Sequence, residues 1–328
     1  MGDVVATMTD TNTGQILQHL PEFLALYNLV ELSPPVLIEQ GEDNLNFRVD
    51  TRTGRVVVRR YERSAQEDIP FELETLSYLA QQHYPVPAVF RTQTGSLLAH
   101  LAGKPAIIME YIDGTYPSPY DSTIPRLIGQ WLAEYHLVVE HFVPQSSKNF
   151  HELTRLELLQ QYAQSAPNFP YTDFLSSIAT LYDKYRSYLT MSLPQLPCGV
   201  IHSDFRPDNL LCEGRQLRAV LDFDTCYMGS FIRDIAETTL IWSMPEKEVI
   251  PISEIIQELL AGYQQVRPLL PEEKTAFYPS TLIACLADAA GYLLRQIIAG
   301  KPASRATDSM MYVRYLNLLE CPSLFQVE

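Results

Sequence analysis

Residues 199–224 read GVIHSDFRPDNLLCEGRQLRAVLDFD and carry the strongest pattern in the chain. An apolar strand is predicted at Gly199–Ile201, and a polar loop follows it directly. In this loop Asn209 comes five positions after Asp204. A second apolar strand is predicted at Leu217–Leu221, and Asp222 stands at its end. Asp and Asn also favour ordinary turns, because their side chains hydrogen-bond to nearby backbone. The spacing of the three residues must therefore decide between a turn and a functional site.

Phosphoryl transfer needs few protein groups, but it needs them in a fixed relation. One carboxylate lies at the attacking hydroxyl, and oxygen ligands hold Mg²⁺ between the phosphates. The kinase pattern H-R-D-L-x-x-x-N, followed by D-F-G, has the same five-residue gap. This chain reads H-S-D-F-R-P-D-N and later D-F-D, so Asp204 supplies the carboxylate at the hydroxyl. His202 and Asp234 are predicted to brace the loop rather than to react.

Upstream of this block the sequence predicts a small half that is rich in strands. Apolar residues at helical spacing over residues 12–30 indicate one amphipathic helix, which Pro34 and Pro35 end. A second helix is predicted over residues 65–82. Short runs of β-branched and aromatic residues predict an antiparallel sheet, with strands in residues 36–40, 44–51, 55–62, 97–101 and 104–112.

Regular structure is interrupted at Asp113 and Gly114 and by three prolines within residues 116–125. We therefore expect an N-terminal lobe at residues 1–112 and a C-terminal lobe at residues 113–328. The second lobe is predicted to be mainly helical, with helices at 124–141, 152–165, 174–189, 232–243, 252–266, 272–299 and 304–319. A β-rich half followed by a helical half is an α+β, two-lobed layout.

Composition argues against several classes of protein. The net charge is −15 and the pI is about 4.9, so the clustered basic residues that bind nucleic acid are missing. Five cysteines without C-x-x-C spacing are typical of reduced thiols, which predicts a cytoplasmic protein. No basic leader precedes an apolar stretch, and no apolar run approaches the ~18 residues of a membrane span. We expect neither a nucleic acid nor a membrane partner.

With these features the chain resembles the aminoglycoside phosphotransferase and choline kinase superfamily, and within it the type II homoserine kinases. The resemblance covers nearly the whole chain. The family's phosphate loop is similar to GEDNLNFRV (41–49), its strand with the phosphate-pairing cation to VVVRRY (56–61), and its helix with the glutamate partner to FELETLSYL (71–79). The hinge is similar to AIIMEYIDG (106–114), and the helix that leads into the large lobe to IGQWLAEYH (128–136). The metal loop is similar to DFDTCYMGSFIRDIA (222–236), and a late stretch of the homoserine kinase branch to LLAGYQQVRPLLPEE (259–273).

The resemblance implies a protein-kinase-like fold that uses ATP and Mg²⁺, and it assigns roles residue by residue. Asp204 is implied to orient or deprotonate the acceptor hydroxyl, while Asn209 and Asp222 bind Mg²⁺. The implied nucleotide contacts are the phosphate loop with Gly41, Asn44 and Asn46, the cation Arg59 with its partner Glu72, and the main chain of Glu110, Tyr111 and Ile112.

The chain departs from the family at several positions. Arg59 stands where many relatives have Lys, and Arg60 is the alternative cation if the strand register shifts by one residue. Ser203 replaces a usual Gly, and Arg206 replaces a common His. Arg206 lies next to the expected acceptor site, which favours an anionic group on the substrate. Asp224 either supports the substrate site or is an exposed loop acid.

We expect an ATP:alcohol phosphotransferase whose acceptor is a small hydroxyl-bearing metabolite, homoserine or a related amino alcohol first. One alternative keeps the fold and changes the acceptor to an aminoglycoside, choline, methylthioribose or a sugar. The other is a non-catalytic, nucleotide-binding pseudokinase, and retention of Asp204, Asn209 and Asp222 argues against it. Sparse acidity in residues 145–175 disfavours an aminoglycoside. The oligomeric state is predicted to be monomer or homodimer.

Overall fold

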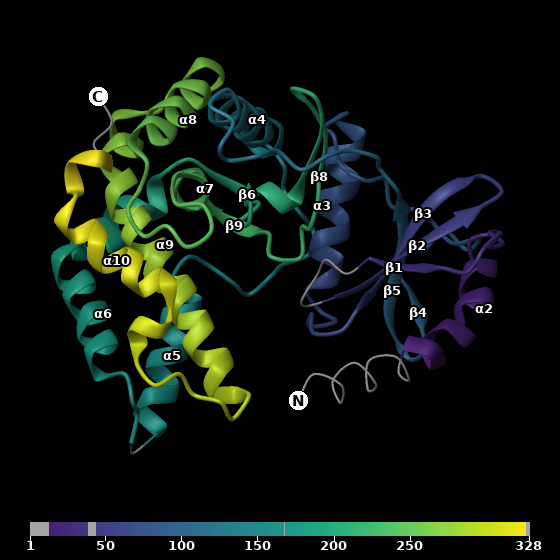
Figure 1. Ribbon diagram of the computed structural model, residues 1–328, viewed down its shortest axis with the longest axis horizontal. Helices are drawn as coiled ribbons and strands as arrows, with labels where there is room; N and C mark the ends of the chain where they lie inside the picture. Colours follow the sequence, from purple (N-terminus) through teal and green to yellow (C-terminus); the bar gives the residue numbers. More distant parts are fainter. Residues whose placement is uncertain (1–12, 39–43, 167, 326–328) are drawn as a thin grey trace. The chain divides into compact units, whose positions relative to one another are not determined.

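The computed structural model describes residues 13–38, 44–166 and 168–325, and the chain divides into two units (Figure 1). Unit 1 comprises Met1–Gly114 with Pro144–Ser147, and unit 2 comprises Thr115–Val143 with Lys148–Glu328. The predicted lobe boundary at residue 112 lies close to the first of these divisions. The return of residues 144–147 to unit 1 has no counterpart in the sequence-based prediction.

Unit 1 is built on a five-stranded antiparallel sheet in the order β1-β2-β3-β5-β4. Its strands are β1 (Val36–Ile38), β2 (Asn44–Thr51), β3 (Gly54–Tyr61), β4 (Ala99–Leu101) and β5 (Lys104–Glu110). The turn between β2 and β3 requires a φ of +127° at Gly54, which glycine adopts without strain. All five strands were predicted, although β4 and β5 are shorter than expected. The last two residues of the first predicted strand, 39 and 40, lie outside the described residues.

Side chains alternate along these strands, so the sheet has two apolar faces. On one face Val58 belongs to the same core as Phe23 of helix α2 (Leu20–Ala25). On the other face Ile107 belongs to the same core as Leu73 of helix α3 (Ile69–Gln81). The pleat therefore decides which side chains of β3 face α2 and which face α3.

The single helix predicted over residues 12–30 is wrong. Among the described residues, 13–18 and 20–25 are helical and a turn at His19 separates them. Pro21 lies in the first turn of α2. Proline has no N–H to donate and its ring crowds the carbonyl four residues earlier, so it favours the start of a new helix at this position.

Unit 2 is mainly helical, as the sequence predicted. Its helices are α4 (Ile124–Val139), α5 (Thr154–Ser165), α6 (Thr172–Lys184), α7 (Phe231–Ser243), α8 (Ser253–Val266), α9 (Pro271–Ile298) and α10 (Met310–Glu320). Helix α9 packs against α5, α7 and α10, while α4 packs along α8. The predicted helix over 304–319 is too long, because α10 begins at Met310. The predicted helix over 174–189 matches α6, which ends at Lys184, together with helical residues 186–187 and a π-helix at Tyr188–Ser192.

Four short strands carry the loops of unit 2. Strand β6 (Cys198–Ile201) pairs with β9 (Tyr227–Ser230), and β7 (Leu210–Glu213) pairs with β8 (Gln216–Val220). The sequence predicted β6 and β8 and missed their partners. The missed strands β7 (LLCE) and β9 (YMGS) show no regular alternation of apolar and polar residues, so the sequence pattern did not reveal them.

Helix α9 departs from one expectation drawn from the sequence. Its most apolar 18-residue window has a mean hydropathy of 1.4, which suffices for a membrane span by length and composition. The prediction that no segment approaches such a span is therefore wrong for α9. Within the protein 61% of this window is buried. The apolar composition is thus that of a core helix.

Two glycines set the close approach of α4 and α8. A Cβ on Gly129 would lie 1.9 Å from the carbonyl oxygen of Leu259, and one on Gly262 would lie 2.0 Å from that of Arg126. Backbone atoms cannot move aside as a flexible side chain can, so neither position accommodates a larger residue. Beside this contact Arg126 donates two hydrogen bonds to Glu258, at 2.7 and 3.1 Å.

Gly262→Ala is expected to lower the free energy of unfolding by at least about 2 kcal/mol, because the added methyl group forces α4 and α8 apart. Denaturant unfolding followed by circular dichroism measures this change. Gly14→Ala is the matched control, since Gly14 is helical and nothing lies within 4 Å of an added Cβ. An unchanged unfolding midpoint for Gly262→Ala would contradict the proposed packing of α4 on α8.

Candidate active site

The loop after β6 takes its shape from Asp234, in the first turn of α7. The backbone N–H groups of His202 and Ser203 each donate to its carboxylate at 2.9 Å, and His136 Nε2 lies 3.1 Å away. Burial alone would raise the pKa of Asp234, but the hydrogen bonds outweigh it and the pKa is lowered. The prediction that Asp234 braces the loop is confirmed.

His202 ties this loop to the end of β8. Its Nε2 donates to the carbonyl oxygen of Leu221 at 2.9 Å, and its Nδ1 accepts the N–H of Asp204 at 3.2 Å. A carbonyl only accepts and an N–H only donates, so the ring carries its proton on Nε2 and is neutral. Burial lowers the pKa of His202, which favours the same neutral form. His202 therefore braces the loop, as predicted.

Asp204 and Asn209 are in direct contact. Asn209 Nδ2 donates to Asp204 Oδ2 at 2.8 Å and to the Asp204 carbonyl oxygen at 3.0 Å. The Asn209 carbonyl oxygen accepts the N–H of Leu221 at 2.8 Å, directly before Asp222. Within unit 2, Asp204, Asn209 and Asp222 thus belong to one loop system.

The environment of Asp204 favours the protonated carboxyl group. Burial raises the pKa of Asp204 to about 7, opposed by the charge of Arg206 and reinforced by the negative charge of Asp222. A carboxyl group with a pKa near neutrality is suited to receive and release a proton.

Two residues of the loop system have left-handed backbone conformations, with φ of +60° at Ser203 and +62° at Asp222. Glycine adopts this region freely, and Asp enters it more readily than most residues. This requirement accounts for the glycine that is usual at the position of Ser203. Here Ser203 is held by its N–H bond to Asp234 and by its Oγ, which donates to Glu237 Oε2 at 3.2 Å.

Sequence reasoning missed a chain of buried polar residues behind Asp234. Arg267 donates to Glu273 Oε1 at 2.9 Å and to the Tyr263 hydroxyl oxygen at 3.2 Å. The Tyr263 hydroxyl then lies 2.7 Å from His136 Nδ1, whose ring reaches Asp234 through Nε2. Apart from Asp234, these residues lie in segments 128–136 and 259–273, which carry the resemblance to the family. The sequence therefore contained a signal for them.

In unit 1 a second group of predicted residues meets on the face of the sheet that carries α3. Arg59 Nη1 lies 3.3 Å from Glu72 Oε1, and Arg59 Nε donates to Asn46 Oδ1 at 3.1 Å. Asn46 and Arg59 are direct partners across β2 and β3. All three residues are buried. A cation is thus held at a defined position between a carboxylate and an amide.

The comparisons with known proteins bear on this pair of residue groups. Residues 36–269 match the model of the phosphotransferase enzyme family (APH), which is more than half of the chain. The chain belongs to this phosphotransferase enzyme family. A curated homoserine kinase of Caulobacter sp. (strain K31) is 30% identical over 260 residues, covering 78% of this chain and 79% of that protein. One of Zymomonas mobilis is 28% identical over 242 residues, covering 73% of this chain and 74% of that protein.

Solved structures agree with the predicted kinase-like, two-lobed α+β fold. An amicoumacin kinase in complex with AMP-PNP and Ca²⁺ has a TM-score of 0.69 at 15% identity and covers 94% of both chains. A microcompartment-associated aminopropanol kinase has a TM-score of 0.66 at 18% identity, covering 94% of this chain and 98% of that chain. The predicted fold class of this phosphotransferase is confirmed.

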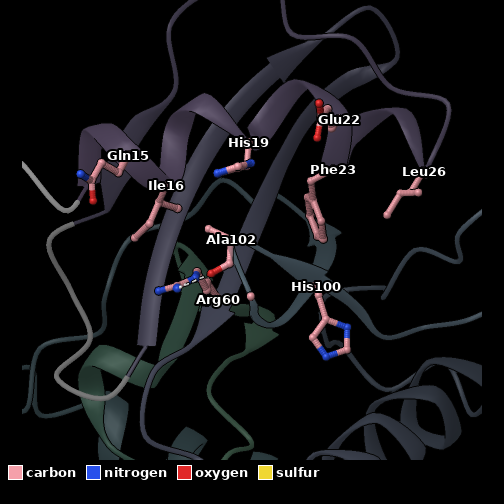
Figure 2. A pocket seen from close by; sticks show the side chains of 10 residues that line it. Gln15, Ile16, His19, Glu22, Phe23, Leu26, Arg60, His100 and Ala102 are labelled. Atoms are coloured by element: carbon pink, nitrogen blue, oxygen red, sulfur yellow. Dashed lines mark hydrogen bonds between the residues drawn. The ribbon is translucent and has the colours of Figure 1, made fainter.

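Arg60, the alternative cation of this phosphotransferase, lies on the other face of the sheet. It donates to the carbonyl oxygens of Leu101 and Ala102 at 2.9 and 3.2 Å, and it pairs with Glu62. A pocket of about 650 Å³ opens on this face, and Figure 2 shows the side chains that line it. The helical side contributes Ile16, His19 and Phe23 and the sheet side Arg60, His100 and Ala102. Arg60 thus faces a region separate from the Arg59–Glu72 pair.

The remaining predicted residues lie at the ends of strands and in loops. Asn44 is the buried first residue of β2, and Glu110 is the exposed last residue of β5. The Glu110 N–H donates to the Ala88 carbonyl oxygen at 2.9 Å, and the guanidinium of Arg55 lies over the Tyr111 ring at 4.8 Å. Ile112 is half-buried directly after Tyr111. Gly41 lies outside the described residues.

The two predicted substrate residues occupy different environments in unit 2. Arg206 is exposed, and its Nε donates to Asp208 Oδ1 at 2.6 Å. Asp224 is half-buried, and its carbonyl oxygen accepts a hydrogen bond from Lys148 Nζ. Lys148 was not among the predicted residues.

Proposed function

We propose that this phosphotransferase is an ATP-dependent homoserine kinase, which transfers the γ-phosphoryl group of ATP to the hydroxyl group of homoserine or a closely related amino alcohol. The observation that carries the proposal is the 30% identity to a curated homoserine kinase over 78% of the chain. The contacts of Asp204 and Asn209 support it, because they fit the chemistry of phosphoryl transfer to an alcohol.

Asp204 is proposed to receive the proton of the acceptor hydroxyl. The acceptor oxygen forms a bond to the γ-phosphorus while the bond from that phosphorus to the β,γ-bridging oxygen breaks, and ADP leaves. The hydrogen bond from Asn209 Nδ2 holds one carboxylate oxygen, and the His202 ring holds the backbone of Asp204. These bonds orient the carboxylate before the acceptor binds, which reduces the cost of reaching the reactive geometry.

Asn209 and Asp222 fit the ligand preference of Mg²⁺, which binds oxygen atoms of one or two protein groups and keeps phosphate and water ligands. The NH₂ group of Asn209 donates to Asp204, so its amide oxygen is the atom available to a cation. Among the described residues no cluster of three or more His, Cys, Asp or Glu is arranged to hold a metal ion. Bound Mg²⁺ would neutralise the charge that develops on the phosphate oxygens.

The Arg59–Glu72 pair and its neighbours are proposed to hold the nucleotide. Arg59 would bind the α- and β-phosphates, and Asn46 and Glu72 would keep its guanidinium in place. Asn44 and the backbone near Gly41 would cover the phosphates. The main chain of residues 110–112 would meet adenine, and because the Glu110 N–H already donates to Ala88, the N–H groups of the next two residues suit this role better.

Acceptor contacts are proposed for Arg206, whose charge suits the carboxylate of an amino acid, and for Asp224. The proposed protein is cytoplasmic, in keeping with its five free cysteines. It works as a monomer or homodimer, and its N-terminal lobe ends at residue 112 of the sequence.

The test is an assay of ADP release with a panel of acceptors: L-homoserine, choline, an aminoglycoside, methylthioribose and simple sugars. We expect ADP release to depend on both Mg²⁺ and homoserine, with kcat/KM for homoserine at least about 100-fold above the other acceptors. Omission of the acceptor is the control for background hydrolysis. Release with no acceptor of the panel would point to a pseudokinase, and a preference for another acceptor would contradict the homoserine assignment.

A further inference from the structure

Helix α7 holds the chain on both sides of Asp204. After Asp204, Trp242 Nε1 donates to the carbonyl oxygen of Phe205 at 2.9 Å. Before it, Ser203 Oγ donates to Glu237 Oε2 at 3.2 Å. All four contacting residues are buried, and Glu237 has no part in the proposed chemistry. The residues that flank the proposed proton acceptor are therefore fastened to one helix.

Ser203 needs its contact because its backbone is strained. Its φ is +60°, a region in which the Cβ of an L-amino acid crowds the carbonyl oxygen that follows it. Glycine enters this region freely, whereas another residue stays there only if its surroundings hold it. The hydroxyl group bonded to Glu237 supplies part of that hold. Alanine would keep the strain and lose the bond, while glycine would have no strain to offset.

The acceptor of this hydroxyl group is itself fixed. Arg233 Nη1 donates to the same oxygen, Glu237 Oε2, at 2.9 Å, and the two residues lie one turn apart on α7. Their side chains are only 3% and 4% exposed. Burial raises the pKa of Glu237, and the charge of Arg233 opposes this effect. Because both donors meet Oε2, this oxygen accepts in either protonation state of Glu237.

The backbone of Ser203 is bonded to the same face of α7. Its N–H donates to Asp234 Oδ1 at 2.9 Å, and Asp234 lies three positions before Glu237. Residues three positions apart share a face of a helix. The backbone and the side chain of Ser203 thus meet neighbouring acceptors. Only the bond to Glu237 depends on the residue being serine.

We infer that Glu237 is a positioning residue of the proposed phosphoryl transfer, which holds Asp204 in place through the Ser203 hydroxyl group. Glu237 serves the reaction only through this hydroxyl group, so the two residues act as a pair. The inference rests on the proposed function, in which Asp204 receives the proton, and extends it. When residue 203 leaves its left-handed conformation, the Asp204 carboxylate is displaced, and kcat falls with the fraction of competent molecules.

Substitutions at residue 203 test the hydroxyl group. Ser203→Ala is expected to lower kcat with L-homoserine by about 10-fold and to leave the KM for ATP unchanged, because the strain remains and the bond is lost. Ser203→Gly should keep kcat within about 3-fold of wild type, since glycine adopts the backbone without a holding bond. This order separates positioning from substrate binding, because a hydroxyl group that contacted the acceptor would be missed equally in both variants.

Removal of the hydrogen-bond acceptor tests Glu237. Arg233→Met/Glu237→Leu removes both charges at once, so that neither is left buried without its partner. In the chain with Ser203 we expect kcat to fall by about 10-fold, as for Ser203→Ala. In the chain with Ser203→Gly the same double substitution should cause no further fall, because no hydroxyl group remains to be held. Contact of Glu237 with the phosphoryl acceptor itself would instead lower kcat/KM in both chains.

Two controls keep the result clear if a variant is less stable. Thermal unfolding is followed for each variant, and kcat is measured well below the lowest midpoint. Ser176→Ala removes an exposed hydroxyl group that donates to the Thr172 carbonyl oxygen on α6 at 2.9 Å, and it should change neither kcat nor KM. If Arg233→Met/Glu237→Leu does not fold, the comparison of Ser203→Ala with Ser203→Gly decides the inference alone.

Equal kcat values in Ser203→Ala and Ser203→Gly would overturn the inference, whether both match wild type or both fall. A further loss caused by Arg233→Met/Glu237→Leu in the chain with Ser203→Gly would overturn it as well. Failure of the proposed function gives a different result, because the wild-type chain would transfer no phosphate to homoserine. If the chain used another acceptor of the panel, the variants would be assayed with that acceptor, and only the homoserine assignment would be wrong. Inactivity with all acceptors would remove both proposals.

Discussion

Asp204→Asn is expected to lower kcat by about 10³-fold or more and to leave the affinity for ATP unchanged. Asparagine has the size of aspartate but cannot receive the hydroxyl proton. Its side-chain oxygen still accepts the hydrogen bond from Asn209 Nδ2, and its N–H still donates to His202 Nδ1. The loop should therefore keep its shape, and the loss should lie in the chemical step alone.

Single-turnover and steady-state phosphate transfer measure this effect, and calorimetric titration with a non-hydrolysable ATP analogue measures binding. Asp183→Asn is a suitable control, because the Asp183 side chain is 77% exposed on α6 and pairs only at the surface with Arg186. A kcat within about 10-fold of wild type for Asp204→Asn would show that this carboxylate is not the proton acceptor.

Asp222→Asn is expected to weaken Mg²⁺-dependent nucleotide binding by about 100-fold or more, since a neutral amide replaces the proposed carboxylate ligand. The choice of asparagine matters here. Asp222 has a φ of +62°, and asparagine tolerates this region better than alanine does. The variant therefore removes the charge with little added backbone strain.

Titration with the ATP analogue, in the presence of Mg²⁺ and of a chelator, measures the metal-dependent part of the affinity. The wild-type chain should lose affinity in chelator, and Asp222→Asn should show the same weak affinity in both conditions. Glu213→Gln, with a side chain 75% exposed on β7, is the control and should bind as wild type does. Wild-type affinity in Asp222→Asn would remove Asp222 from the proposed metal site.

The local sequence pattern predicted where most strands and helices lie. It did not predict the residues at which they begin and end. The five strands of unit 1 show alternation or β-branched runs, and each was placed near its observed residues. The break at His19 depends on the missing N–H of Pro21, which the apolar spacing conceals. Strands β7 and β9 lack a regular alternation of apolar and polar residues, so no periodic pattern reveals them.

The candidate site was predictable where its residues lie close together in the chain. Asp204 and Asn209 are five positions apart, and the spacing alone pointed to their contact. The contacts of His136 with Asp234 and with Tyr263 join residues 98 and 127 positions apart. No local spacing encodes such pairs, because they arise from the packing of α4, α7 and α8. Sequence alone therefore identified the reactive loop and missed most of the residues that surround it.

Phosphorus NMR of a reaction with L-homoserine, ATP and Mg²⁺ tests the central proposal most directly. We predict a new phosphomonoester signal that couples to methylene protons of homoserine, grows in step with ADP and is absent with Asp204→Asn. Consumption of ATP that yields inorganic phosphate alone, or no consumption when homoserine is added, would contradict phosphoryl transfer to this acceptor.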